Sequence, residues 1–167
     1  MPHPNNDCVL AIHPTYRSFG WAIFEAPDVL LDWGLVHANG RTSDRLLKRL
    51  GRILSRHQPS VLVLEEYDGD ASKRADRIRG LLQAFEKTAG AHAVPTVLYE
   101  RELVARILGL APTASRYDVA CAVAARIDDL SHRMPPKRKF GSSEDARQSL
   151  FAAAALAMTH YAVLGRD

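Results

Sequence analysis

The sequence predicts an α/β fold in which a mixed five-stranded sheet carries helices on both of its faces. Three short apolar segments bounded by turns come first in the chain, and helical and strand-like patterns then alternate. One later apolar run, Val61–Glu65, has no polar residue before its last position. Such a run is typical of a strand covered on both faces. We therefore expect a hairpin meander on one side of the sheet and crossover strands on the other.

The first three segments, residues 8–13, 18–25 and 30–36, are predicted to form an antiparallel meander. The first strand ends on a polar residue, His13, and a turn at residues 14–17 leads directly into the second. Gly34 and Gly40 indicate a close approach or a turn. A strand that presents one polar side chain at its tip is a common way to place a ligand at the edge of a sheet.

The next element is predicted to be a helix, Asp44–His57, with Ser43 as its N-cap. Its apolar residues recur at helical spacing on one face, and its basic residues lie largely opposite. These apolar residues are Leu46, Leu47, Leu50, Ile53 and Leu54. Pro59 ends the helix and leads into the strand Val61–Glu65.

The second half of the chain is predicted to be mostly helical. We expect a helix from about residue 72 to 88, a fifth strand at residues 94–99, and two helices at 100–108 and 115–127 separated by Gly109 and Pro112. A last, alanine-rich helix is expected at residues 144–164, capped by Ser142 or Ser143. The chain shows no repeat and no interdomain linker, so we expect a single domain over residues 1–167.

The composition is that of an ordinary soluble globular protein. Of the 167 residues, 47% are hydrophobic and 25% are charged, which excludes a disordered chain. No apolar stretch approaches the ~18 residues that span a bilayer, and no secretory signal is visible at the N-terminus. Cys8 and Cys121 both lie in apolar runs, so we expect two buried thiols in a reducing compartment. These features predict a cytoplasmic protein.

Two clusters of basic residues suggest an anionic partner. The net charge is only +3, but its distribution is uneven. Each cluster could neutralise phosphates of DNA or RNA, and the alternative is solvated surface. The first cluster is Lys73, Arg74, Arg77 and Arg79, and the second is Arg133, Lys137, Arg138 and Lys139.

Two predicted strands end in residues that can bind metals. His13 ends the first strand, and the only adjacent glutamates of the chain, Glu65 and Glu66, end the strand that begins at Val61. Two strand tips with potential ligands are what a polynucleotide-cutting site needs. The chain has neither a Walker-type loop nor a G-x-G-x-x-G motif, so a nucleotide-binding function lacks its backbone cradle.

The order of elements and these motifs resemble the RNase H-like superfamily and, within it, the RuvC family of Holliday-junction resolvases. That family has a first strand ending in a pattern like I-D-P-G-S-R-x-x-G-[YW]. In the matching segment, residues 10–21, the proline, arginine, glycine and aromatic are Pro14, Arg17, Gly20 and Trp21. The metal-binding aspartate is replaced by His13. The resemblance implies an RNase H-like, RuvC-type fold and covers nearly the whole chain.

The resemblance also implies the remaining site residues. Glu65, after an apolar run and a proline, is the expected second ligand, with Glu66 as the alternative. At the place where the family has an aromatic residue that contacts the junction, this chain has Asp68, one position after Tyr67. The family's last helix begins with two acidic residues three apart, and only the first has a counterpart here. That counterpart is Asp145, with Glu144 as a substitute, whereas Gln148 and Ser149 stand where the second aspartate would be.

The function implied is structure-selective DNA cleavage at branched or four-way junctions, in DNA recombination and repair, by a homodimer that uses Mg²⁺ or Mn²⁺. The expected dimer face is the one-sided apolar stripe of residues 72–88, and the alternative is packing against the chain's own sheet. The catalytic residues expected are Glu65, Asp145 and His13, and the metal ligands expected are His13, Glu65, Glu66, Glu144 and Asp145. The DNA contacts expected are Arg17, Lys73, Arg74, Arg77, Lys137, Arg138 and Lys139.

His13 leaves the activity open, because two-metal hydrolysis needs several carboxylates and a neutral imidazole can ligate only one ion. One hypothesis is a re-tuned, single-metal site, since imidazole suits Mn²⁺ or Zn²⁺ better than Mg²⁺. A second is a catalytically inactive, RuvC-like protein that only binds nucleic acid. A third is that His13 is hydrogen-bonded to Glu65 or Asp145 as a neutralising pair.

Overall fold

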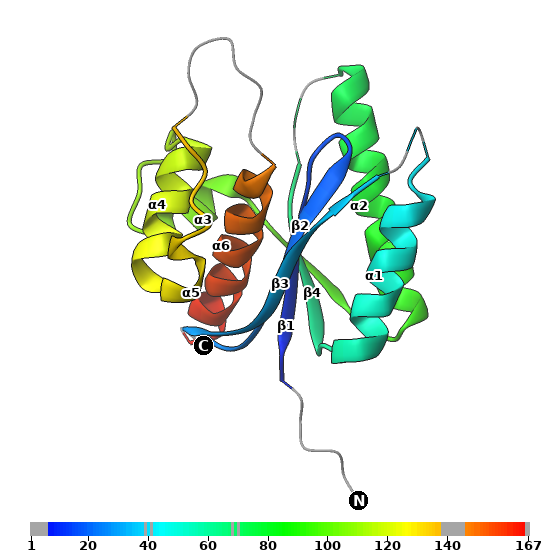
Figure 1. Ribbon diagram of the computed structural model, residues 1–167, viewed down its shortest axis with the longest axis horizontal. Helices are drawn as coiled ribbons and strands as arrows, with labels where there is room; N and C mark the ends of the chain where they lie inside the picture. The colour runs from blue at the N-terminus through cyan, green and yellow to red at the C-terminus, as the bar shows by residue number, and fades with distance from the viewer. Residues whose placement is uncertain are drawn as a thin grey trace, which may run out of the picture.

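One sheet lies between two layers of helices (Figure 1). The computed structural model describes residues 7–38, 40, 42–67, 69, 71–137 and 146–165. None of the helices within these ranges is both long enough and apolar enough to cross a membrane.

The sheet contains five strands in the order β3-β2-β1-β4-β5. The first three, β1 (Val9–Pro14), β2 (Ser18–Ala26) and β3 (Val29–His37), form an antiparallel meander. On the other side of β1, β4 (Val61–Glu65) and β5 (Thr96–Tyr99) are added in parallel. The predicted mixed five-stranded sheet with helices on both faces is therefore confirmed.

Helices cover both faces of the sheet, as Figure 1 shows. One layer is α1 (Asp44–His57) and α2 (Lys73–Ala91). The other is α3 (Arg101–Ile107), α4 (Arg116–Arg126), α5 (Asp128–Ser131) and α6 (Arg147–Leu164).

The alternation of side chains along β1 explains why its sequence is apolar throughout. Val9 and Ala11 pack in the core on the side of α4 and α6, whereas Leu10 and Ile12 pack in the core on the side of α1 and α2. Successive side chains of a strand point to opposite faces, and both faces are covered here. β4 follows the same rule, with Val61 and Val63 on the α6 side.

The structure corrects several details of the sequence prediction. Ser43 stands at the N-cap of α1, but its side chain makes no capping hydrogen bond. The fifth strand begins at Thr96 rather than Val94, because the Val94 N–H donates to Ala89 at the end of α2. The short α5 was not predicted, since four residues are too few to show helical periodicity. The predicted start of the last helix and its caps, Ser142 and Ser143, lie outside the described residues.

The expectation of two buried thiols is wrong for one of them. Cys8 is buried, and burial raises the pKa of its thiol. Cys121 is exposed, because the buried side of α4 is formed by Val119, Ala120 and Val123. An apolar run in a helix does not show which of its residues face solvent.

The apolar stripe of α2 is used within the chain's own core. Ile78, Leu81 and Phe85 are buried, and Leu81 and Phe85 pack with β1, β4 and α1 residues. The apolar stripe of α2 therefore packs against the chain's own sheet, which was the alternative to a dimer face. The homodimer stays a prediction.

Candidate functional site

The ends of β1 and β4 bring two predicted site residues together. These strands are parallel neighbours in register from Val9 and Val61 onward, so their carboxyl ends lie at the same edge of the sheet. At that edge, His13 Nε2 lies 3.4 Å from Glu65 Oε2. Both side chains are largely shielded from solvent, with 12% and 11% of their surface exposed.

The period of two along each strand determines which glutamate joins His13. Val61 and Val63 face the layer of α4 and α6, and Glu65 continues that series. Glu66 is exposed, and its backbone N–H donates to Tyr99. Glu65 is therefore the glutamate that lies beside His13.

A residue that the sequence analysis did not identify, Arg116, completes the cluster. Its Nη1 donates to Glu65 Oε2 and its Nη2 to Glu65 Oε1, each at 3.1 Å. This is a bidentate pair, in which one planar guanidinium engages both oxygens of one carboxylate.

The start of α4 holds Arg116 in place. Arg116 is the first residue of the helix, directly after the N-cap Ser115. Ser115 and Asp118 form a capping box, in which the Ser115 hydroxyl accepts from the Asp118 N–H and the Asp118 carboxylate accepts from the Ser115 N–H. The S-x-x-D pattern predicts a helix start from the sequence, but it does not show what Arg116, the residue after Ser115, contacts.

The cluster keeps Glu65 ionised. Burial alone would raise the pKa of this carboxyl group, but the hydrogen bond and charge of His13, together with Arg116, outweigh burial and hold the pKa far below its usual range. At neutral pH the site therefore contains a carboxylate anion that is paired with the Arg116 cation.

The first turn of α6 lies close to the same end of β1. His13 pairs with Gly20 of β2, and a Cβ at Gly20 would lie 2.4 Å from the Leu150 nitrogen. The absence of a side chain at Gly20 thus allows the backbone of α6 to approach the sheet here. Gln148, two residues before Leu150, is 5% exposed, and its Oε1 accepts no hydrogen bond from any residue that the structure describes. A neutral amide occupies the position where the resemblance implies an aspartate.

The described residues do not fit a two-metal centre. Within the described ranges, no group of three or more His, Cys, Asp or Glu side chains is arranged to hold a metal ion. Both oxygens of Glu65 already accept hydrogen bonds from Arg116. The predicted ligands Glu144 and Asp145 lie outside the described residues. Two divalent ions need several shared carboxylates, and Glu65 is the only carboxylate that the described part of the chain places beside His13.

Two of the predicted DNA-binding residues, Arg17 and Arg77, lie beside an aromatic side chain that was not predicted. Tyr16, in the turn between β1 and β2, is 41% exposed. The guanidinium carbons of Arg17 and Arg77 lie 5.9 and 5.0 Å from the centroid of its ring, and Arg77 also donates to the Tyr16 carbonyl. We call Tyr16, Arg17 and Arg77 the Tyr16 patch.

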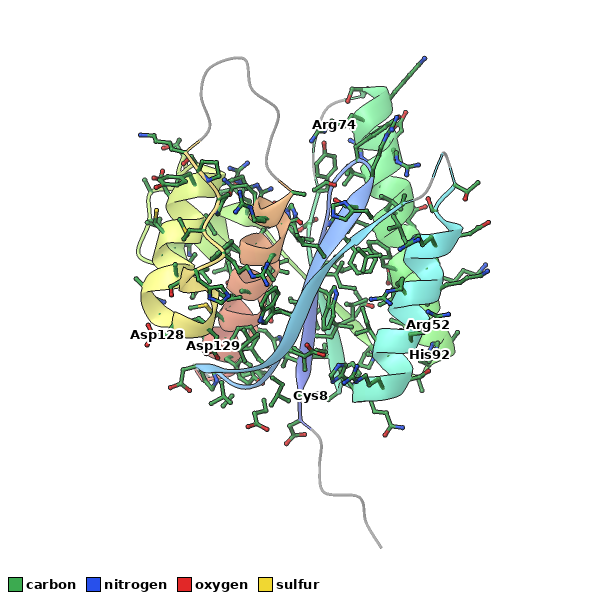
Figure 2. All side chains as sticks on the ribbon, in the orientation of Figure 1. Cys8, Arg52, Arg74, His92, Asp128 and Asp129 are labelled. Carbon is green, nitrogen blue, oxygen red and sulfur yellow. The ribbon has the colours of Figure 1, made fainter. Side chains whose placement is uncertain are left out.

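The other predicted DNA-binding residues are more dispersed. Lys73 and Arg74 are exposed in the first turn of α2, and Figure 2 shows Arg74 at the end of the molecule opposite Cys8. Lys137 is exposed, and its charge, after the hydrogen bonds from Ser115, contributes to lowering the pKa of Asp118 at the start of α4. Arg138 and Lys139 lie outside the described residues.

Tyr67, two residues after Glu65, packs against Arg79 and Gly69. The Arg79 guanidinium lies 5.7 Å from the centroid of the Tyr67 ring and donates to the Gly69 carbonyl. A Cβ at Gly69 would overlap the Tyr67 ring, so this ring lies directly against the Gly69 backbone. Asp68, the residue at the position of the family's aromatic, lies outside the described residues.

Comparison with known proteins finds similarity in structure but not in sequence. No protein-family model matches the chain, and no curated protein matches it. Among solved structures, the chain is similar to Thermus thermophilus RuvC, with 22% identity, a TM-score of 0.70 and coverage of 95% of this chain and 96% of that one. The complex of the same RuvC with a Holliday junction substrate gives a TM-score of 0.71 at 22% identity, again over 95% and 96% of the two chains.

A viral protein shows the same architecture at lower similarity. The fowlpox virus Holliday junction resolvase has 12% identity and a TM-score of 0.59, with coverage of 93% of this chain and 99% of that one. In both comparisons the match covers nearly the whole of both chains, with a TM-score above 0.5. The chain therefore has the fold of the RuvC-type Holliday junction resolvases.

Proposed function

We propose that this chain binds branched DNA, four-way junctions foremost, at the sheet edge formed by the ends of β1 and β4. The observation that carries the proposal is the Tyr16 patch, an exposed aromatic ring flanked by two arginines next to His13 in the chain. Aromatic rings stack on unpaired bases, and arginines contact phosphates, which is the combination used by proteins that bind single-stranded or opened nucleic acid. The similar RuvC fold has been solved with a Holliday junction bound.

The distribution of charge supports the same surface. Lys73 and Arg74 extend the Tyr16 patch along the first turn of α2. In Figure 2, Arg74 lies at one end of the molecule, whereas Asp128 and Asp129 lie near the other. Phosphate contacts made by such a basic end would account for most of the affinity, and the opening of bases at a branch point would make the Tyr16 ring selective.

The geometry favours binding without two-metal cleavage. Glu65, the carboxylate that the resemblance assigns to the metals, is held by Arg116, and Gln148 replaces a second carboxylate. The residues of the site then have a binding role. Arg116 and His13 keep Glu65 ionised and fixed, and the surrounding arginines contact the DNA backbone.

A structure-selective endonuclease of RuvC type is the second candidate. It is favoured by the position of Glu65, an ionised carboxylate at the end of β4 beside the end of β1. Cleavage through Glu65 would require Arg116 to release this carboxylate when DNA binds, and Mg²⁺ or Mn²⁺ to enter in its place.

Binding to a labelled four-way junction, beside a linear duplex of the same sequence, tests the first proposal. We expect tighter binding to the junction, and a loss of roughly tenfold or more in Tyr16→Ala, because stacking on one base contributes about 1–3 kcal/mol. Arg52→Ala is the matched control, since Arg52 is an exposed cation on α1 outside the patch. Equal affinity for junction and duplex, or no effect of Tyr16→Ala, would contradict the proposal.

The same substrates, incubated with Mg²⁺ or with Mn²⁺, separate the two candidates. The binding proposal expects intact strands with either metal. Symmetric nicks that disappear in Glu65→Gln would instead establish the endonuclease.

Light scattering of the free protein tests the homodimer, which two equivalent junction strands would require. A monomer at micromolar concentration would exclude symmetric resolution by a preformed dimer.

A further inference from the structure

We infer that the Arg116 guanidinium is a built-in cation that takes the place of a divalent metal at Glu65, so that this site binds its ligand without a metal ion. The part of this inference that concerns DNA rests on the proposed function. The part that concerns the metal rests only on the geometry of His13, Glu65 and Arg116.

The two carboxylate oxygens of Glu65 already have hydrogen-bonding partners. Both accept a hydrogen bond from Arg116 at 3.1 Å, and Oε2 also lies 3.4 Å from His13 Nε2. A magnesium ion binds a carboxylate oxygen at about 2.0–2.1 Å, so an ion at either oxygen would lie directly beside the guanidinium. The two like charges would repel each other, and the metal could enter only if Arg116 left.

The second argument is that Arg116 is held in place. Its backbone is fixed by the capping box of Ser115 and Asp118, and α4 packs through Ala120 and Val123 into the core that contains α6. Only 26% of its side chain is exposed. This differs from a loose surface ion pair, in which two long side chains lose conformational freedom for little gain.

The third argument is the balance of charge. Among the described residues of the site, one carboxylate, Glu65, is matched by one guanidinium, and Gln148 contributes a neutral amide where a metal centre would have an anion. A divalent ion in this setting would leave an excess of positive charge among largely buried groups. Arginine therefore suits this donor set better than a metal does.

The guanidinium also provides donors for a phosphate. An arginine has five N–H groups, and its two bonds to Glu65 use two of them. The others can donate to a phosphodiester oxygen, a contact that a metal ion would make in a nuclease. We therefore expect junction binding to have the same strength in EDTA as in Mg²⁺ within a few fold.

Mn²⁺ binding to the free protein, followed by the electron paramagnetic resonance signal of unbound Mn²⁺, tests the inference without DNA and without activity. For the wild type we expect no Glu65-dependent site up to about 1 mM Mn²⁺, the range of weak carboxylate sites. For Arg116→Gln we expect a site at least tenfold tighter, lost again in the double variant Arg116→Gln/Glu65→Gln. Arg101→Gln is the matched control, because Arg101 is an exposed arginine of α3 that donates to the Ala114 carbonyl near the start of α4.

Each outcome decides the inference. Mn²⁺ bound by the wild type and lost in Glu65→Gln would overturn it, and so would a folded Arg116→Gln that gains no site. If Glu65→Gln binds as much Mn²⁺ as the wild type, that Mn²⁺ is bound elsewhere on the protein, and the result agrees with the inference. If Arg116→Gln does not fold, the comparison of wild type with Glu65→Gln decides alone. Failure to bind a four-way junction would contradict the proposed function, but it would not change the outcome of the Mn²⁺ measurement.

Discussion

Two histidine–carboxylate pairs lie on opposite faces of the sheet and differ in what surrounds them. His57 Nε2 lies 3.1 Å from Asp32 Oδ2, and His13 Nε2 lies 3.4 Å from Glu65 Oε2. The His57 pair joins the last turn of α1 to the edge strand β3, and the Asp32 side chain is 36% exposed. The His13 pair is shielded, and a guanidinium engages both oxygens of its carboxylate.

The shorter nitrogen–oxygen distance, in the His57 pair, does not identify the pair that contributes more to stability. The Asp32 carboxylate is 36% exposed, so solvent screens its interaction with His57. At Glu65, burial makes each remaining interaction count for more and makes an unpaired charge costly. We therefore expect a larger loss of stability from breaking the shielded pair with its arginine than from breaking the His57 pair.

Removal of Arg116 should have the largest effect on stability. Arg116→Ala leaves Glu65 as a shielded charge without its guanidinium, and breaking such a pair costs about 3–5 kcal/mol of unfolding free energy. Urea denaturation measures this loss. Arg101→Ala should lose less than about 0.5 kcal/mol, as expected for a surface substitution. Equal losses in both variants would show that the Glu65 pair is no stronger than a surface contact.

A side chain at Gly20 should disturb the site end of the molecule specifically. The Cβ of Gly20→Ala would lie 2.4 Å from backbone atoms of Leu150 and Ser149, and such overpacking costs about 1–3 kcal/mol. Gly80→Ala in α2 is the matched control, because nothing lies within 4 Å of its added Cβ. We expect the control to be neutral or more stable by up to about 1 kcal/mol, since alanine favours helices. Thermal unfolding of both variants gives the answer, and similar melting temperatures would contradict the close approach of α6.

Acid should remove the contribution of Glu65. Its folded pKa is depressed, so the stability it provides is fully present above the unfolded pKa, about 4.3, and is lost as the pH falls towards the folded value. Over the first unit of pH below about 4.3, the wild type should lose about 1 kcal/mol relative to Glu65→Gln. Denaturation curves at several pH values measure this difference, and a constant difference down to pH 3 would refute the depressed pKa.

The smallest effect is expected at the other pair. Asp32→Asn removes an exposed partner of His57 and should cost about 0.5 kcal/mol or less, decreasing further in high salt. Unfolding free energies at low and high ionic strength test this. A loss as large as that of Arg116→Ala would remove the distinction between the two pairs.

The fold could be predicted from the sequence because its signals are local. The apolar runs at Val61–Glu65 and in the first strand, and the helical spacing of leucines in Asp44–His57, each appear within one element. Two local predictions failed. Cys121 was expected to be buried but is exposed, because an apolar run does not identify the solvent side of a short helix. The helix α5 was not predicted, because four residues are too few to show helical periodicity.

The site was only partly predictable, for a physical reason. His13 and Glu65 were identifiable because each ends an apolar strand, and parallel neighbours end at the same edge. Arg116 lies 51 positions from Glu65, and its partner depends on how α4 packs against the sheet. The assignments of Asp145, Glu144, Arg138 and Lys139 fall outside the described residues and stay predictions.

Anomalous X-ray diffraction from a crystal of the wild-type protein soaked in Mn²⁺ would show whether a guanidinium or a metal ion occupies the Glu65 carboxylate. We predict no anomalous peak there, with the Arg116 guanidinium still bound to both Glu65 oxygens. A manganese peak within bonding distance of a Glu65 oxygen, with Arg116 turned away, would contradict this prediction. That result would favour the second candidate function, a metal-dependent endonuclease.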